Sequence, residues 1–245
     1  MGSVHFAGLS WEEIKQKLQT EGSFNKTYDS DIDGVLNDTA VPDLWLNKQR
    51  WNWWFETGTM RTATSGSGEV NTSFRQFRLT TGTTSESYAR AGLYAGNTNF
   101  TMENFRALLF VAFYDWADKA MDNSEAYVIF SGRSPDESEF PQWGYIGIYM
   151  SNGKVYARTH DGSAYTETLI RTFSSGGWCL MSPLLIEATF TRVKFYRKDG
   201  TLLAEHTTNI PNLRNLFWQP VLYIKNTAAE NKGLYLENVM VEMEV

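Results

Sequence analysis

The sequence predicts an all-β protein in which two antiparallel sheets pack face to face, preceded by one short helix. Three observations lead to this prediction. Short runs of apolar residues, many alternating with polar ones, recur along most of the 245-residue chain. Turn-forming pairs such as Asn152-Gly153, Asp161-Gly162 and Asp199-Gly200 separate many of these runs. Only one stretch reads clearly as a helix, and many short strands with frequent turns are typical of sandwiches and barrels.

The predicted helix lies near the start of the chain. Ser10 precedes the sequence WEEIKQKLQ, and Glu13 follows three residues later, which is the spacing of a capping box. We expect the helix to end near Gly22, and we interpret residues 1–24 as a helical extension and residues 25–245 as the sandwich domain. The apolar residues of the helix share one face at helical spacing: Trp11, Ile14 and Leu18.

An acidic segment follows the helix and matches the opening of a calcium-binding loop, D-x-D-x-D-G, at Asp29, Asp31, Asp33 and Gly34. Such a loop supplies oxygen ligands at alternate positions and ends with a carboxylate at its twelfth position. Here that position is Ala40. Two interpretations therefore stay open: a calcium site completed by Asn37 or Asp38, or a solvated acidic turn. No other cofactor is required by the sequence.

The remaining chain predicts strand after strand. Residues 105–114 are continuously apolar and aromatic, which indicates a strand buried on both faces. A polar, acidic loop bracketed by prolines covers residues 133–142. The full set of expected strands covers residues 50–56, 70–79, 85–95, 105–114, 126–130, 143–150, 154–160, 164–171, 184–189, 192–198, 201–207, 218–225 and 233–244.

The first of these strands is the densest aromatic stretch, RWNWWFE. Alternation along a strand places Trp51 and Trp53 on one face and Trp54 on the other. Two faces that both carry tryptophan cannot both face one core. Either the N-terminal helix covers one of them, or Trp51, Trp53 and Trp54 offer a stacking surface to a sugar or a partner protein.

The hairpin at residues 143–160 has a register that the sequence fixes. Asn152-Gly153 favours a two-residue turn with positive φ at both positions, which pairs Ser151 with Lys154. One face of the hairpin then carries Ile146, Ile148, Met150, Val155 and Ala157 and belongs in the core. The other face carries a gap at Gly147 and five amphipathic side chains, which are the candidate glycan-binding residues: Tyr145, Tyr149, Tyr156, Arg158 and His160.

The strand after this hairpin has two alternatives. A two-residue turn at Asp161-Gly162 would place Tyr165 and Glu167 on the amphipathic face. A three-residue loop through Ser163 would place Thr166 and Thr168 there instead. A slip of one residue exchanges the faces of a strand completely, so both alternatives stay open.

Composition excludes several classes of function. The net charge is −6 and no run of Lys or Arg is present, which argues against nucleic-acid binding. No apolar stretch reaches the roughly 18 residues that a membrane-spanning helix needs. Cys179 is the only cysteine, which excludes an internal disulfide. The start of the chain shows no basic segment followed by an apolar run, so we expect no signal peptide.

Three stretches together resemble the concanavalin A-like lectin and glucanase jelly roll. They are YIGIYMSNGKVYARTHDGSAYTETL, LLIEATFTRVKFYRKDGTLLAEHTTNIP and WQPVLYIKNTAAENKGLYLENVMVEMEV, in the order found in the second half of such domains. The resemblance covers residues 126–245 and extends more weakly to residues 51–95. It is similar to variants seen in virion proteins of phages and archaeal viruses.

The resemblance implies two curved sheets, a concave face that holds sugars, and a final strand that pairs near the N-terminus. Glucanases of this family carry Glu-x-Asp-x-(x)-Glu on one strand, so that two carboxylates flank the scissile bond. That motif is absent here. The nearest approximations are Asp29-Ser-Asp31-Ile-Asp33, which precedes the expected sandwich strands and ends in Gly34, and Glu242-Met-Glu244, which lies at the end of the given sequence.

We therefore expect a non-catalytic virion or cell-surface protein that binds glycan on its concave sheet. Two alternatives stay open: a purely structural capsid or decoration subunit, and a polysaccharide hydrolase or lyase with an atypical site. The expected partners are a glycan or other virion or surface subunits, a homo-oligomer being one form of such a contact. The resemblance places the protein on a virion or an extracellular surface.

Overall fold

The computed structural model describes residues 49–52, 60–73, 76–93, 104–131, 144–181, 183–197, 199–213 and 219–244. Every helix or strand among these residues is a strand, as the sequence predicts. The strands are β1 (Gln49–Asn52), β2 (Met60–Ser65), β3 (Glu69–Ser73), β4 (Gln76–Thr80), β5 (Tyr88–Leu93), β6 (Asn104–Asp115), β7 (Ser124–Ser131), β8 (Tyr145–Ser151), β9 (Lys154–His160), β10 (Tyr165–Thr172), β11 (Gly177–Leu180), β12 (Leu184–Thr189), β13 (Val193–Arg197), β14 (Leu202–His206), β15 (Gln219–Asn226) and β16 (Lys232–Glu244).

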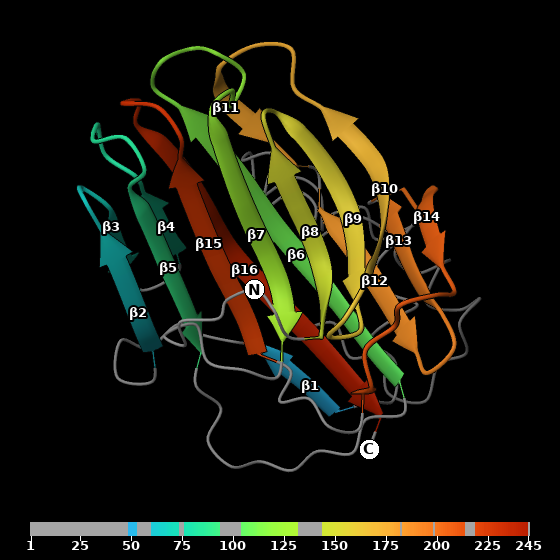
Figure 1. The fold of residues 1–245 in the computed structure, drawn as a ribbon. Helices are drawn as coiled ribbons and strands as arrows, with labels where there is room; N and C mark the ends of the chain where they lie inside the picture. The colour runs from blue at the N-terminus through green and yellow to red at the C-terminus, as the bar shows by residue number, and fades with distance from the viewer. Residues whose placement is uncertain are drawn as a thin grey trace, which may run out of the picture.

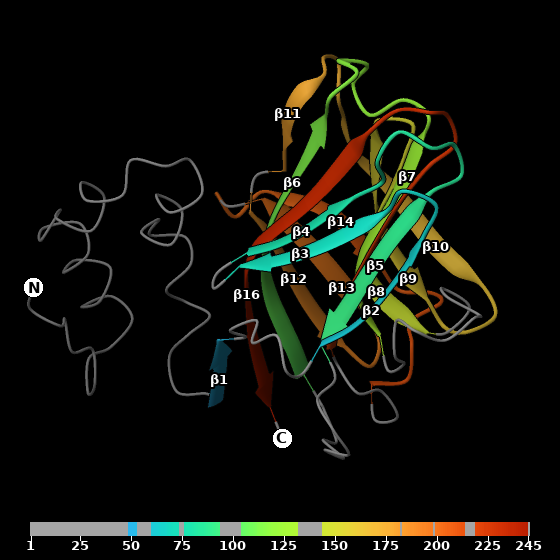
Figure 2. The same cartoon turned by 90° about the vertical axis from the view of Figure 1, so that its left-hand side faces the viewer.

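The strands form two antiparallel sheets that pack as a sandwich. The seven-stranded sheet has the order β10-β9-β8-β7-β15-β5-β2, and Figure 1 looks onto its outer face. The nine-stranded sheet has the order β14-β13-β12-β6-β16-β4-β3, with β1 paired to β16 and β11 paired to β6. Figure 2, turned by 90°, shows β6, β12 and β16 in one layer and β8, β9 and β10 in the other. The predicted all-β class with two packed antiparallel sheets is confirmed.

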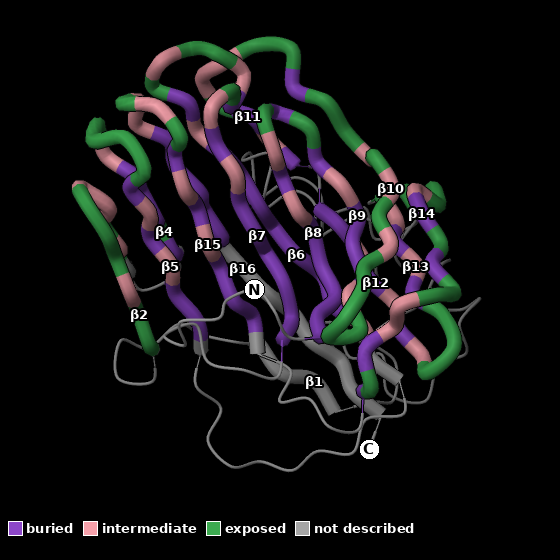
Figure 3. The backbone as a smooth tube through the Cα atoms, in the orientation of Figure 1, coloured by how far each residue is buried: buried purple, intermediate pink, exposed green. Residues whose placement is uncertain are grey.

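The core between the sheets is apolar and closely filled. Its members come from alternate positions of the strands, so the neighbouring positions face outward. The central strands β7 and β8 are buried along nearly their whole length, whereas the edge strand β10 alternates exposed and half-buried residues (Figure 3). The predicted core face of the hairpin is confirmed, because each of its five side chains is buried in this core: Ile146, Ile148, Met150, Val155 and Ala157.

A buried charge cluster lies at one end of the sandwich. The Nζ atom of Lys232 lies 2.8 Å from a carboxylate oxygen of Asp115 and 3.0 Å from Oε2 of Glu230, and the side chains of Lys232 and Asp115 are fully buried. The Asp115 carboxylate also accepts hydrogen bonds from the backbone N–H groups of Ala117, Lys119 and Met121 at 2.8–3.1 Å. We call Asp115, Glu230 and Lys232 the buried charge cluster, and the exposed Lys119 forms an ion pair with Glu230 at its rim.

Three connections that cross from one sheet to the other meet at this cluster. They are residues 81–87 between β4 and β5, residues 116–123 between β6 and β7, and residues 227–231 between β15 and β16. Backbone hydrogen bonds join them, for example from Thr81 N–H to the Lys232 carbonyl (3.0 Å) and from Thr227 N–H to the Asn123 carbonyl (2.8 Å). The cluster therefore fixes one end of both sheets.

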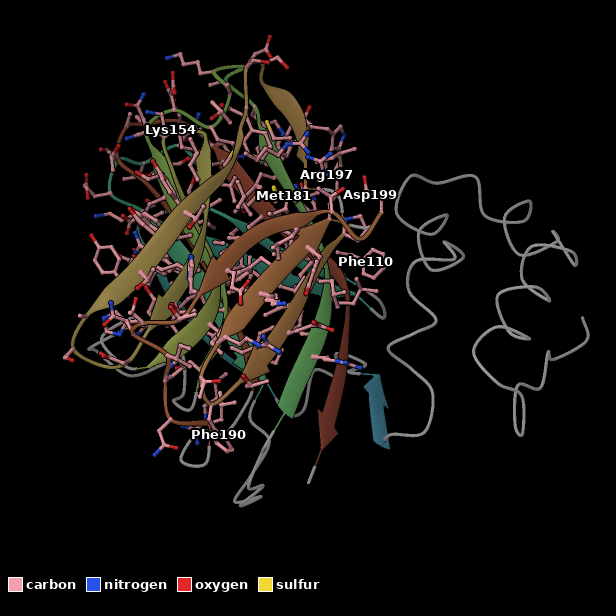
Figure 4. The ribbon with its side chains drawn as sticks, turned by 90° about the vertical axis from the view of Figure 1, so that its right-hand side faces the viewer. Phe110, Lys154, Met181, Phe190, Arg197 and Asp199 are labelled. Carbon is pink, nitrogen blue, oxygen red and sulfur yellow. The ribbon has the colours of Figure 1, made fainter. Side chains whose placement is uncertain are left out.

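A second polar contact joins the sheets along one edge, where β10 faces β14. His206 is buried, and its two ring nitrogens lie 3.1 Å from Thr159 Oγ1 and 3.0 Å from Thr168 Oγ1. Thr166 and Thr208 bridge their hydroxyls nearby at 2.8 Å. In Figure 4 this edge faces the viewer, with Arg197 and Asp199 marking the turn between β13 and β14 and Lys154 marking the start of β9 in the other sheet.

Some expected elements differ from the observed ones. Residues 70–79 contribute to two strands, β3 and β4, which pair with each other antiparallel, with Ser73 opposite Gln76. The strands β2 and β11 are absent from the expected set: β2 is short and mostly polar, β11 has only four residues, and both lie at sheet margins. The final strand does pair near the N-terminus, because Trp51 of β1 lies opposite Val241 of β16. The predicted helix and the loop at residues 133–142 lie outside the described residues.

Candidate functional site: the tyrosine face of the seven-stranded sheet

A row of tyrosines crosses the outer face of the seven-stranded sheet. Strand register aligns Tyr223 of β15, Tyr127 of β7, Tyr149 of β8 and Tyr156 of β9 side by side. The centroids of successive rings lie 5.9, 4.8 and 6.2 Å apart, which is the range of favourable aromatic contacts. We call these four residues the tyrosine row, and the outward side chains around them the tyrosine face.

The hairpin between β8 and β9 has the predicted register. Ser151 pairs with Lys154, Tyr149 with Tyr156, and Tyr145 with His160. The turn has positive φ at both Asn152 (47°) and Gly153 (72°), as a two-residue Asn-Gly turn requires. All five candidate residues of this hairpin therefore lie on one face.

The next strand adds Tyr165 and Glu167 to the tyrosine face. Tyr165 pairs with His160, and Glu167 pairs with Arg158. The alternative with Thr166 and Thr168 on this face is wrong. The turn itself differs from the expected Asp-Gly pair, because Asp161 donates its N–H to the Ala164 carbonyl (3.1 Å) and the two central residues are Gly162 and Ser163. The Asp161 carboxylate caps this turn by accepting hydrogen bonds from the backbone of Ser163 and Ala164.

Arg158 lies between two aromatic rings. Its Cζ atom is 3.7 Å from the ring centroid of Tyr149 and 4.4 Å from that of Tyr165. Its Nε donates to Glu167 Oε2 at 2.9 Å, and a second nitrogen forms an ion pair with the same oxygen. It also shares a hydrogen bond with Tyr145. Burial alone would lower the pKa of Arg158, but the hydrogen bonds with Tyr145 and Glu167 outweigh it, and the pKa lies above its ordinary value.

Gly147 of β8 leaves a gap on the tyrosine face opposite Arg158. It lies opposite Arg158 on one side and Ile129 on the other. A Cβ atom at Gly147 would lie 2.2 Å from the Val128 carbonyl oxygen and 2.7 Å from Ile129 Cα. Only glycine therefore lets β8 approach β7 this closely, and the missing side chain leaves the position opposite Arg158 without a neighbour on β8.

Tyr145 and His160 form a stacked pair at one end of the face. Their ring centroids lie 5.1 Å apart, and the planes differ by only 3°. Nδ1 of His160 accepts a hydrogen bond from the Gly162 N–H at 3.0 Å, which orients the imidazole. Tyr145 is only 2% exposed, whereas His160 is half-buried. Tyr145 therefore supports the imidazole from below and does not itself present a ring to solvent.

Four buried or half-buried phenol groups of this face stay protonated at neutral pH. Burial raises the pKa of Tyr127, Tyr145, Tyr149 and Tyr223 above the ordinary value of 10.0. Each hydroxyl can consequently both donate and accept a hydrogen bond. Neutral hydroxyls beside exposed ring faces are suited to binding polar ligands that also carry apolar C–H surfaces, and they supply no nucleophile.

Accessibility divides the five predicted residues. Tyr149, Tyr156 and His160 are half-buried and reach the surface, while Tyr145 and Arg158 are buried. Sequence reasoning missed several residues of the same face, namely Tyr127 and Tyr223 of the tyrosine row together with Arg90 of β5, which pairs with Tyr223. Their alternation within each strand was visible, but the order of the strands in the sheet was not.

The other predicted site residues lie mostly outside the described part of the chain. This holds for Trp53, Trp54 and the acidic residues Asp29, Asp31 and Asp33. Trp51 is placed only by its backbone, in β1. Within the described ranges no group of three or more His, Cys, Asp or Glu side chains is arranged to hold a metal ion. No helix in that part of the chain has the length and apolarity to cross a membrane.

No protein-family model matches the sequence, and no curated protein matches it. Among solved structures, the fold is similar to that of a native glycosidic hydrolase, with a TM-score of 0.51 and 15% identity over 80% of this chain and 96% of that chain. It is also similar to the metal-free carbohydrate recognition domain of Emp46p, with a TM-score of 0.49 and 10% identity over 76% of this chain and 88% of that one.

A third similar structure is the binding domain of botulinum neurotoxin DC in complex with rat synaptotagmin II, with a TM-score of 0.47 and 11% identity. The match covers 75% of this chain and only 43% of the toxin chain. At these identities the likeness shows the fold alone. The match to the glycosidic hydrolase supports the expected two-sheet sandwich.

Proposed function

We propose that this chain is a non-catalytic glycan-binding protein whose ligand lies on the tyrosine face. The observation that carries the proposal is the tyrosine row, which presents Tyr149 and Tyr156 at the surface next to the 53% exposed ring of Tyr165. Aromatic rings pack against the C–H surfaces of sugar rings, and their hydroxyls hydrogen-bond the sugar hydroxyls. Lectins and glycosidic hydrolases share this type of sandwich, although a fold by itself does not fix a function.

The buried members of the face have a positioning role in this proposal. Arg158 holds the rings of Tyr149 and Tyr165 from within and keeps Glu167 at the surface of the sheet. His160, fixed by Gly162 and by stacking on Tyr145, is placed to exchange hydrogen bonds with a sugar hydroxyl. The exposed rings supply the contact area, and Glu167 supplies acceptor oxygens at its rim.

A glycan array tests this proposal. The wild-type protein and the double variant Tyr149→Ala/Tyr156→Ala are compared, with Tyr196→Ala on the nine-stranded sheet as the matched control. We expect the double variant to lose at least about tenfold in affinity for the bound glycans, since each stacked ring contributes on the order of 1 kcal/mol or more. Unchanged binding by the double variant, or equal loss in the control, would exclude the tyrosine face as the site.

We further propose that the protein acts on a virion or an extracellular surface, with adhesion as its role. This proposal has its support in the resemblance of residues 126–245 to virion variants of the fold. A purely structural capsid or decoration subunit is the alternative within this class. Light scattering on the full chain and on a chain lacking residues 1–24 distinguishes adhesion from a structural role. A subunit that assembles through the extension would show a molar mass that falls when residues 1–24 are deleted.

An enzymatic role is the third alternative. The described part of the tyrosine face carries Glu167, which Arg158 engages, and Glu125 of β7, which lies two residues from Tyr127 on the same face. A hydrolase or lyase would release reducing ends or unsaturated products from a polysaccharide panel. We expect neither product, and their formation at a rate that Tyr149→Ala/Tyr156→Ala abolishes would replace the binding proposal with a catalytic one.

A further inference from the structure

A second group of aromatic side chains lies on the outer face of the other sheet, the nine-stranded one. Trp178 of β11 pairs with Tyr114 of β6, and Tyr114 pairs with Gly233 of β16. Two residues further along β16, Tyr235 lies on the same face, and Trp116 follows β6 directly. We call Tyr114, Trp116, Trp178 and Tyr235 the aromatic platform.

The rings of the platform touch one another in edge-to-face and tilted geometry. Tyr114 lies at the centre, with its ring centroid 4.6 Å from that of Trp116 and 4.9 Å from that of Trp178. The Trp178 ring also lies 5.0 Å from that of Tyr235. Such pairs are among the preferred aromatic arrangements and restrict ring motion. Trp178 and Trp116 remain 57% and 41% exposed, which is unusual for rings held so closely.

The backbone beneath the platform is shaped to hold Trp116. Gly233 leaves open the space that the Trp116 ring occupies, because a Cβ atom there would lie 2.9 Å from Cζ3 of Trp116. Trp116 is also the first residue of the connection that the Asp115 carboxylate holds through three backbone N–H groups. In that connection Asp118, Ala120 and Met121 have positive φ, a conformation that costs energy in residues other than glycine.

A guanidinium group, that of Arg78, lies beside the aromatic platform. Cζ of Arg78 on β4 lies 5.6 Å from the ring centroids of both Trp116 and Tyr235. Arg78 is exposed, and among the described residues it has no carboxylate partner. The platform therefore combines flat apolar rings with a donor group whose hydrogen-bonding capacity is left for a ligand.

The size of the platform favours a small ligand over a protein. Stable protein interfaces bury about 1,200–2,000 Å² in total. On the described part of this sheet face the neighbouring apolar side chains Leu108, Phe110 and Ala112 are at most 2% exposed. The exposed apolar surface around Arg78 is thus essentially that of two indoles, which corresponds to one or two sugar rings.

We propose that the aromatic platform is a second glycan-binding site, which takes a sugar ring against Trp178 and Trp116 and directs Arg78 to a hydroxyl or carboxylate of that sugar. It lies on the opposite sheet from the tyrosine face and does not depend on the function proposed for that face. A protein with both sites would bind a glycan layer from two sides.

The test uses the full chain and a printed array of neutral and acidic oligosaccharides. The variants are Trp178→Ala and Trp116→Ala, with Trp178→Phe as the conservative control and Tyr149→Ala/Tyr156→Ala to remove the tyrosine face. We expect a subset of array glycans to survive the tyrosine double variant and to lose about tenfold or more in affinity with Trp178→Ala, while Trp178→Phe keeps most of the binding. Arg78→Gln then separates the two ligand types, because it weakens acidic sugars more than neutral ones.

Several results would overturn the proposal. One is an array pattern that neither tryptophan variant changes, provided that circular dichroism shows both to be folded. Another is loss of all binding in the tyrosine double variant, which would leave the tyrosine face as the only site. An absence of glycan binding by the wild type would also exclude it. A fall in sedimentation mass with Trp178→Ala and no change on the array would identify a protein contact instead.

Discussion

Arg158 is a charged side chain whose partners all come from its own sheet. Two rings, one carboxylate and one phenol surround a guanidinium that is 8% exposed. A buried charge that loses its counter-charge keeps the cost of its lost hydration. We therefore expect the ion pair of Arg158 with Glu167 to contribute more to the free energy of unfolding than an exposed ion pair of the same sheet.

We predict that Glu167→Ala lowers the free energy of unfolding by about 1–2 kcal/mol, the usual range for a charge-assisted hydrogen bond that is partly solvated. The matched control is Glu86→Ala, which removes the exposed ion pair with Lys225 and should cost less than about 1 kcal/mol. Urea denaturation measures both. Equal losses of free energy in the two variants would mean that burial beside the Tyr149 and Tyr165 rings does not strengthen the ion pair of Arg158 and Glu167.

His206 provides a residue whose effect depends on pH. Burial lowers its pKa below the ordinary value of 6.5, since the charged imidazole would lose its hydration between the two sheets. Between the lowered pKa and 6.5 the unfolded chain binds a proton that the folded chain does not bind. The contribution of His206 to stability is therefore complete above about pH 6.5 and falls as the pH decreases below that value.

We expect the wild type to lose stability between about pH 7.5 and pH 5.5, and His206→Asn to lose less over the same interval. Thermal unfolding at both pH values gives the two differences. Carboxylates of lowered pKa, such as those of Asp161 and Glu230, both at about 2, act only below about pH 4.5 and do not disturb the comparison. Parallel pH profiles for the two proteins would contradict the role given to His206.

At the scale of the strand, Gly147 decides how closely β7 and β8 approach. We predict that Gly147→Ala costs at least about 3 kcal/mol or prevents folding, because the added Cβ would overlap the backbone of β7. Gly200→Ala is the matched control: Gly200 has a φ of +81° and open space around its Cα, so only backbone strain of about 1 kcal/mol is expected. Guanidinium denaturation compares the two, and similar costs would show that β8 can move away from β7.

Hairpins are the elements that the sequence predicts best. The pair Asn152-Gly153 fixes the register of β8 and β9 through local backbone preference alone, and that register is confirmed. The turn after β9 is harder to predict. The Asp161 side chain caps a turn centred on Gly162 and Ser163, which replaces the expected turn centred on Asp161 and Gly162. The division of residues 70–79 into β3 and β4 could not be predicted, because no Gly, Pro, Asn or Asp lies between Thr72 and Leu79 to signal a turn.

The tyrosine row could not be predicted, although each of its members lies on an expected strand. Tyr223 and Tyr127 become neighbours only because β15 inserts between β7 and β5. That order depends on crossovers between the sheets, which local patterns do not encode. The aromatic platform was hidden for the same reason, since its members come from β6, β11, β16 and a connecting segment.

For the whole molecule, the buried charge cluster holds together three crossing connections. We predict that Lys232→Met lowers the free energy of unfolding by about 3–5 kcal/mol, because Asp115 would stay fully buried without its counter-charge, while Glu230 keeps its ion pair with Lys119. Lys225→Met, which removes a partly exposed lysine of the neighbouring sheet, should cost less than about 1 kcal/mol.

Chemical denaturation followed by both fluorescence and circular dichroism measures this effect. A cost for Lys232→Met within about 1 kcal/mol of that for Lys225→Met would show that the cluster is dispensable. Coincident transitions by the two probes would indicate that both sheets still unfold together.

The position of β16 has a consequence for when the protein can fold. This strand spans Lys232–Glu244 and lies inside the nine-stranded sheet, between β6 and β4, where it also pairs with β1. During synthesis those three strands leave the ribosome long before their common neighbour exists. The apolar residues of β4 and β6 stay open to solvent on that side until β16 has emerged, and contacts so distant in sequence form slowly. The nascent chain is therefore exposed to aggregation and available to chaperones until β16 has been synthesised.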